Sequence, residues 1–209
     1  MHLPRVFTGL LFAVSATLAG SGVAHTEMLA SKTFSYFTIG GKTAAELDEQ
    51  LSSHGPLMKG TGARHPGATK IKFGGTVTYV ENNGRCGVGE AKVTLNTRII
   101  LPKWKHRGSA KRDLALIWDT LAGDIKRHEE RHAEIARQHA RRMEKRLLKL
   151  RPEADCERMQ ARVGRESMDA IAAHDKDQAR FDRSEAANFD RRIMRLLEYR
   201  LKTREKNKS

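Results

Sequence analysis

The chain has 209 residues, of which 39% are hydrophobic and 31% are charged, with 39 Lys and Arg against 25 Asp and Glu. This length suggests one domain, with or without a tail, and the periodic Leu, Ile, Val and Phe exclude a wholly disordered chain. No apolar run of about 18 residues follows the N-terminus, which excludes a protein with several membrane spans. Zinc-finger and Cys-x-x-Cys redox spacings are absent, because the two cysteines are far apart in the sequence.

Residues 1–24 have the pattern of a secretory signal peptide. Arg5 supplies a basic start, and Val6 to Leu18 form an apolar stretch that is too short to span a bilayer comfortably. Gly22 to Ala24 supply the small residues of a cleavage site. We therefore expect cleavage after Ala24 and a periplasmic or secreted protein, with an uncleaved membrane anchor as the alternative.

An exported chain meets an oxidising compartment, where Cys86 and Cys156 are the only possible intramolecular disulfide pair. In the chain-entropy model, a bridge over a loop of this length stabilises the folded state by about 4 kcal/mol. Two free, buried thiols are the alternative.

The first half of the exported chain predicts a small antiparallel sheet with one early helix. β-Branched and aromatic residues predict strands at 33–39, 69–80 and 92–100. The turn signal Asn82-Asn83-Gly84 predicts that the last two strands form a hairpin. In the last strand, alternate residues share one face. These residues are Val93, Leu95, Thr97 and Ile99.

The early helix is predicted by its start and its end. Thr43 and Glu46 have the spacing of a capping box, and Leu47 and Leu51 share one face of the helix that follows. His54-Gly55-Pro56 ends it.

From Ala110 onward, the spacing of apolar residues changes from two to three or four, which predicts a helix of up to about 40 residues. Pro152 separates this helix from a second one that begins near Glu153 and carries Met159, Val163 and Ile171. A third helix is expected around Phe189 to Leu201. The stripe of the long helix consists of Leu114, Trp118, Leu121, Ile125, His128, His132, Ile135, His139, Met143 and Leu147. The prediction is an α+β domain at 25–190, followed by a basic helix end and tail at 191–209.

Residues 128–132 read His-Glu-Glu-Arg-His, an HExxH pattern on a predicted helix. Residues four apart share a helix face, so His128 and His132 can bind one Zn²⁺ at about 2.0–2.1 Å. Glu129 is turned by about 100°, so its carboxylate can act as general base on a metal-bound water. Both histidines lie on the apolar stripe, whereas Glu130 and Arg131 lie outside it. The alternative is a pair of buried histidines on an ordinary amphipathic helix.

A catalytic zinc ion usually has three protein ligands, and the third must come from another segment. His139 is two turns beyond His132, about 10.8 Å along a continuous helix, so a packing role suits it better. The candidates for the third ligand lie in the later helices: His174, Asp175, Asp177, Asp182 and Glu185.

Several segments, in this order, resemble a bacterial family catalogued as a domain of unknown function and described as predicted secreted zinc-dependent proteases. They are TIGGKTAAELDEQLSSHGP, TVTYVENNGRCGV, IILPKW, IWDTLAGDIKRHEERHAEIA and Cys156, and they span about residues 33–190. The resemblance implies a zincin-like site at His128, Glu129 and His132 and a Cys86–Cys156 bridge. Family members tend to carry a Tyr-Asp, Thr, His-Gly pattern near the end of the domain. Here Phe181-Asp182 resembles its start, but Glu185 and Ala187 stand where Thr and His are expected, which leaves the third ligand open between Asp182 and His174.

The sequence thus predicts an exported zinc metalloprotease that acts on peptides or proteins. A metal-binding envelope protein without catalysis, which uses its helices for a partner, is the second hypothesis. The formal net charge of +14 suggests a third, a binder of nucleic acid or of an anionic surface. The signal sequence and sparse aromatic residues argue against nucleic acid, so an acidic envelope surface is the more natural counterpart of the charge.

Overall fold

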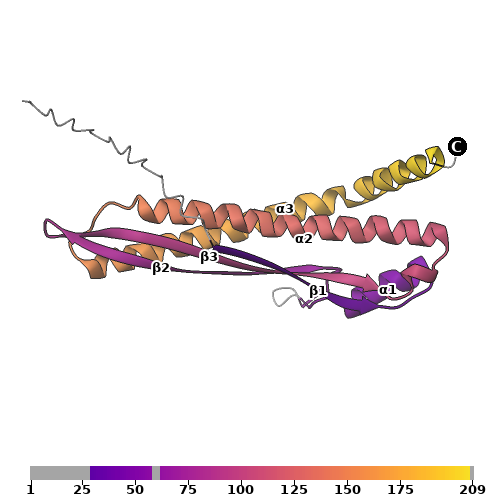
Figure 1. Ribbon diagram of the computed structural model, residues 1–209, viewed down its shortest axis with the longest axis horizontal. Helices are drawn as coiled ribbons and strands as arrows, with labels where there is room; N and C mark the ends of the chain where they lie inside the picture. The colour runs from indigo at the N-terminus through magenta and orange to yellow at the C-terminus, as the bar shows by residue number, and fades with distance from the viewer. Residues whose placement is uncertain (1–28, 58–61, 208–209) are drawn as a thin grey trace, which may run out of the picture.

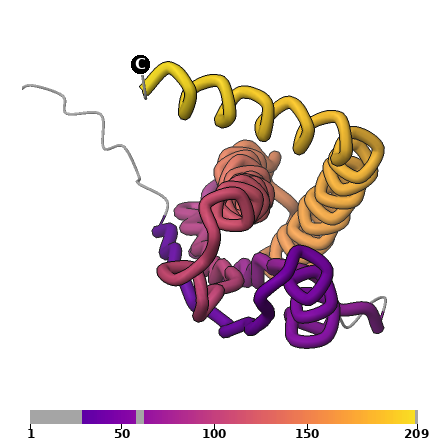
Figure 2. The backbone as a smooth tube through the Cα atoms, turned by 90° about the vertical axis from the view of Figure 1, so that its right-hand side faces the viewer, coloured from indigo at the N-terminus to yellow at the C-terminus, as the bar shows by residue number. Residues whose placement is uncertain are grey.

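The computed structural model describes residues 29–57 and 62–207, so the expected signal peptide and its cleavage site lie outside the described residues. Its elements are β1 (Leu29–Ile39), α1 (Ala44–His54), β2 (Ala68–Asn82), β3 (Arg85–Trp104), a short 3₁₀ helix (Arg107–Ser109), α2 (Arg112–Leu148) and α3 (Cys156–Lys206). The molecule is elongated, and the strands and α2 run along its long axis (Figure 1). Viewed along that axis, α3 lies beside α2 and its last part crosses over α2 (Figure 2). The predicted α+β class is confirmed.

The sheet has the strand order β1-β3-β2 and is mixed. β2 pairs antiparallel with β3, whereas β1 pairs parallel with it, with Leu29 opposite Thr94. The prediction of an antiparallel sheet is therefore wrong for β1. β3 carries the most continuous buried face, so it occupies the centre, and both other strands pair with it. Because β2 runs back along the sheet and β3 returns, β1 and β3 point in the same direction.

The predicted hairpin is confirmed, with a turn of two residues. Asn83 and Gly84 have φ angles of 51° and 69°, as the tight hairpin turns that match the strand twist require. Just after the turn, Cys86 forms a disulfide with Cys156, the first residue of α3. Cys86 and Glu153 also exchange two backbone hydrogen bonds of 2.9 and 2.8 Å. The far end of the hairpin is thus fixed to the start of α3, and the alternative of two free thiols is wrong.

The cap of α1 also forms as predicted. The Thr43 side chain accepts a hydrogen bond from the backbone N–H of Glu46, and the Glu46 carboxylate accepts one from the backbone N–H of Lys42. Leu47 and Leu51 are buried and pack against the other members of a small core. The other buried members of this core are Ile39, Trp104 and Trp118.

The main core lies between the inner face of β3 and the two long helices. Every residue of the predicted stripe on α2 is buried or half-buried. The core's buried residues are Cys86, Ala91, Val93, Leu95, Ala136, Ala140, Met143, Leu147, Met159, Val163 and Ala170. The inner face of β3 therefore sets the position of α2, and with it the position of the HExxH residues.

α3 is a single helix of 51 residues, so the prediction of two helices in this region is wrong. Ile171, expected on the core stripe, is exposed, and Ala170 is buried instead. The apolar stripe fades after Ala170 because the residues that face α2 are then polar, starting with His174. Among the described residues, no helix is long and apolar enough to cross a membrane.

Candidate metal centre and cleft

His128 and His132 of α2 meet Asp182 of α3 where the two helices face each other. The two Nε2 atoms are 3.0 Å apart, and Asp182 Oδ1 lies 2.9 Å from Nε2 of His132 and 3.4 Å from Nε2 of His128. Within the described parts of the chain, this is the only group of three His, Cys, Asp or Glu residues with the spacing of a metal site. Of the two candidates left open for the third ligand, Asp182 therefore lies beside the histidine pair and His174 does not.

The distances between these three atoms fit a zinc ion. Ligands at about 2.0–2.1 Å in tetrahedral geometry are about 3.3 Å from one another, close to the separations of 2.9 to 3.4 Å found here. Two imidazoles and one carboxylate are also a usual donor set for catalytic zinc, which keeps a fourth position open. The residues present can therefore hold the metal with small side-chain adjustments.

A chain of hydrogen bonds orients His132. The backbone carbonyl of His132 can only accept, so the Gln178 side-chain nitrogen must be the atom that donates to it, at 3.1 Å. The Gln178 side-chain oxygen then accepts from Nδ1–H of His132, and the amide nitrogen also donates to Nε2 of His174 at 2.8 Å. His174 Nδ1 donates to Asp175 at 2.9 Å. These directions leave the lone pair of His132 Nε2 free to bind a metal.

His128 faces a carboxylate instead. Its Nδ1 lies 3.6 Å from an oxygen of Glu185, which is itself paired with Arg127 and Arg192. Burial lowers the pKa of His128, and the neighbouring His132 lowers it further, against the opposing effects of Asp182 and Glu185. The neutral imidazole, which is the metal-binding form, is therefore favoured.

A buried ion pair next to Glu185 holds the two helices together. Arg192 of α3 donates two hydrogen bonds, of 2.9 and 3.0 Å, to the carboxylate of Asp124 on α2, and Arg127 donates a third at 2.9 Å. Burial opposes the ionisation of Asp124, but the hydrogen bonds from both arginines outweigh it and hold the pKa of this carboxyl below its usual value. The pair fixes α3 on α2 at the level of the histidines.

Glu129 points from α2 toward the sheet and is only 6% exposed. Its Oε2 accepts a hydrogen bond of 2.8 Å from the hydroxyl of Thr69 on β2. Burial raises the pKa of Glu129, and the bond from Thr69 opposes this effect. Gly67 lies so close that a Cβ there would be 2.9 Å from Glu129 Oε1. The residue before β2 must therefore be small for Glu129 to occupy this position.

A cleft of about 450 Å³ opens beside His128, Glu129 and Asp182. Its walls come from the segment before β2 and from the two long helices, and they are largely apolar. The apolar wall residues are Pro66, Gly67, Ile125, Ala186 and Phe189. A cleft of this size suits a small ligand or one to two residues of a peptide.

The remaining predicted residues lie outside the group of three. His139 is buried, bonds Asp177 at 2.9 Å, and packs edge-on against His174 with ring centroids 5.5 Å apart. No motif points to Gln178, although it lies four residues from both His174 and Asp182 and so shares their helix face. Phe181 has a further contact, because its ring stacks on His128 at 5.0 Å.

A family model described as "Bacterial protein of unknown function (DUF922)" matches residues 34–189. This range covers most of the chain and includes the HExxH residues and Asp182, so the chain belongs to this family. No curated protein and no solved structure matches it.

Proposed function

We propose that this family member is a zinc-dependent peptidase in which His128, His132 and Asp182 hold the ion and Glu129 acts as general base. One observation carries the proposal: the two histidines of an HExxH helix and a carboxylate from another helix converge at ligand distances. A glutamate of the same motif and an apolar cleft lie beside them.

The chemistry divides between the metal and the chain. A bound zinc ion supplies Lewis acidity and lowers the pKa of water toward about 7. Glu129, held by Thr69, takes a proton from the attacking water and returns it to the leaving amine. The apolar walls of the cleft exclude water from the side chain of the substrate next to the bond that is cut.

Two features of the chain support a location outside the cytoplasm. The Cys86–Cys156 disulfide is typical of an oxidising compartment, and residues 1–24 have the pattern of a signal peptide. We therefore propose that the protein acts in the periplasm or outside the cell, on peptides or proteins that it meets there.

The test measures zinc content and cleavage of a broad peptide library for the wild type and for Glu129→Gln. We expect about one zinc ion per chain in both proteins and an activity loss of about 10²–10⁴-fold in the variant, because an amide cannot accept the proton. Glu130→Gln is the matched control. This neighbour, which lies 4.0 Å from Lys32 outside the site, should tolerate the same change.

The possible outcomes separate the hypotheses. If Glu129→Gln retains its zinc and cleaves as fast as the wild type, the proposed mechanism is wrong. If the wild type binds zinc through His128, His132 and Asp182 but cleaves nothing, the metal-binding envelope protein without catalysis is the better description. Equal zinc content in the wild type, His132→Ala and Asp182→Asn would contradict the metal centre itself.

A further inference from the structure

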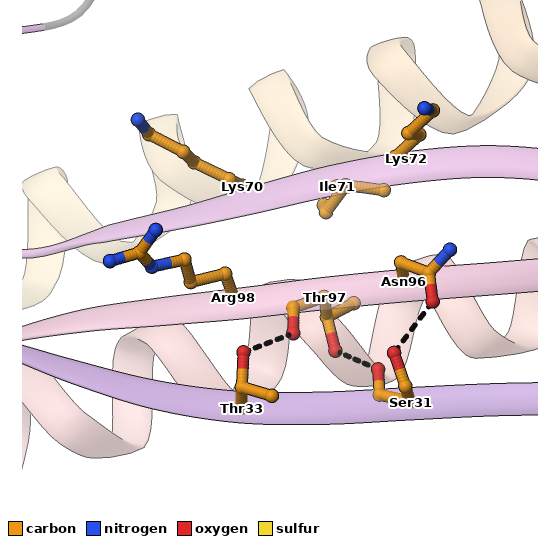
Figure 3. Close-up of a pocket in the computed structure, with 8 residues that line it drawn as sticks. All are labelled: Ser31, Thr33, Lys70, Ile71, Lys72, Asn96, Thr97 and Arg98. Carbon is orange, nitrogen blue, oxygen red and sulfur yellow. Dashed lines mark hydrogen bonds between the residues drawn. The ribbon is translucent and has the colours of Figure 1, made fainter.

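The face of the sheet that points away from α2 and α3 carries a group of three exposed cations. They are Lys70 and Lys72 on β2 and Arg98 on β3 (Figure 3). Lys70 lies directly opposite Arg98 in the antiparallel ladder, and Lys72 lies opposite Asn96. We call these three residues the cationic sheet face. They border a shallow cleft of about 230 Å³.

This arrangement is unfavourable without a ligand, since like charges directly opposite each other destabilise a pair of strands. Among the described residues, Lys70 and Lys72 have no acidic partner, and the guanidinium of Arg98 donates one hydrogen bond, of 3.1 Å, to the Ser35 hydroxyl. The other polar side chains of the cleft are neutral, and they include Ser31 and Asn96, which bond each other at 2.6 Å. The face thus offers positive charge and hydrogen-bond donors with no anion to neutralise them.

We propose that the cationic sheet face docks the protein on an anionic phospholipid surface. A protein partner would be expected to use aromatic or apolar anchors, and a single-stranded nucleic acid would need aromatic rings on which bases stack. The cleft has no aromatic residue, and Ile71, the one large apolar residue beside it, packs its side chain against the core on the other side of the sheet. A layer of phosphate headgroups requires only cations and donors on an accessible face.

The geometry keeps the metal centre accessible during docking. Successive residues of a strand point to opposite faces, so Thr69 contacts Glu129 on the helix side while Lys70 points away from it. A bilayer against Lys70, Lys72 and Arg98 would therefore leave the cleft beside His128 facing the solvent. The proposal does not depend on zinc binding or on peptidase activity.

The test measures how much of the full chain floats with vesicles of phosphatidylcholine, with or without phosphatidylglycerol. The apolar stretch at 6–18, where it is retained, would bind both vesicles alike, so the readout is the ratio between the two affinities. The triple variant Lys70→Gln, Lys72→Gln, Arg98→Gln should reduce this ratio by roughly a hundredfold, since each cation near such a surface contributes about fivefold.

The matched control removes three exposed cations from the helices: Lys145→Gln, Arg165→Gln, Lys176→Gln. It has the same net charge as the first triple variant, so it should keep most of the preference for anionic vesicles. An equal loss in both triple variants would show that net charge alone drives binding and would overturn the proposal. The proposal would also be wrong if inorganic phosphate released the protein from vesicles more strongly than chloride does at equal ionic strength. A third contrary result would be that the protein does not bind vesicles, but binds poly-glutamate or an oligonucleotide in a way that the first triple variant weakens.

Discussion

α3 is held to the rest of the molecule in two regions that differ in chemistry. Its first part is fixed by the Cys86–Cys156 disulfide and by the apolar contacts of Met159, Val163 and Ala170. Farther along, between 174 and 192, hydrogen bonds and ion pairs join α3 to α2, together with the ring of Phe181 on His128. We call the first part of α3, from Cys156 to Ala170, the apolar anchor, and the part from 174 to 192 the polar region.

The two regions differ in what they require of their side chains. Apolar burial stabilises in proportion to area and tolerates exchanges of similar volume. Buried polar groups are costly unless each is hydrogen-bonded, and their bonds fix direction as well as position. We infer that the anchor supplies most of the stability, and that the polar region uses this stability to hold His128, His132 and Asp182 in a defined geometry.

The largest expected effect comes from removing the disulfide of the apolar anchor. Replacing both cysteines, as Cys86→Ala with Cys156→Ala, removes a bridge over 70 residues and should lower the free energy of unfolding by about 4 kcal/mol. Urea unfolding, with the midpoint and slope compared, measures this loss. The zinc affinity of the folded fraction should change little, because neither cysteine belongs to the proposed metal centre of His128, His132 and Asp182. If the double variant kept the stability of the wild type but lost much of its zinc affinity, the apolar anchor would position the metal ligands and would not be the main source of stability.

A smaller effect is expected when one hydrogen bond of the polar region is removed. Gln178→Ala removes the acceptor of His132 Nδ1–H, and the loss of such an orienting partner typically lowers metal affinity by about 10–100-fold. Gln138→Ala, a matched change on the exposed side of α2, should leave the affinity unchanged. Competition with a zinc chelator gives both values. If the two variants bind zinc alike, the hydrogen-bond chain does not orient the ligand.

The sequence predicted those features that depend on neighbours along the chain. The capping box at Thr43 and Glu46 and the turn at Asn83-Gly84 depend on contacts within a few residues, and the stripe on α2 follows from helical spacing alone. The parallel pairing of β1 joins residues about 65 positions apart, such as Leu29 and Thr94. No local signal specifies it.

The sequence pattern did not predict a single long α3 for a different reason. Its stripe continues from Val163 and Ala170 through His174, Gln178 and Asp182 at spacings of four to seven residues, so the helix face is unbroken. Hydrophobic periodicity detects only the apolar part of such a face. The polar part of this face can be recognised only once the structure shows that His128 and His132 of α2 lie against it.

The smallest expected effect has the opposite sign and lies in the anchor region. Gly164 is in the interior of α3 and has open space where a Cβ would be. Gly164→Ala should therefore raise the free energy of unfolding by about 0.5–1 kcal/mol, since alanine loses less backbone entropy in a helix.

At Gly67, the same change places a Cβ 2.8 Å from Ile125 Cγ2 and 2.9 Å from Glu129 Oε1. It should lower stability and displace the proposed general base. Thermal unfolding measures the change in stability of both variants. If Gly67→Ala were more stable than the wild type, the Glu129 side chain would be free to move away from the added Cβ.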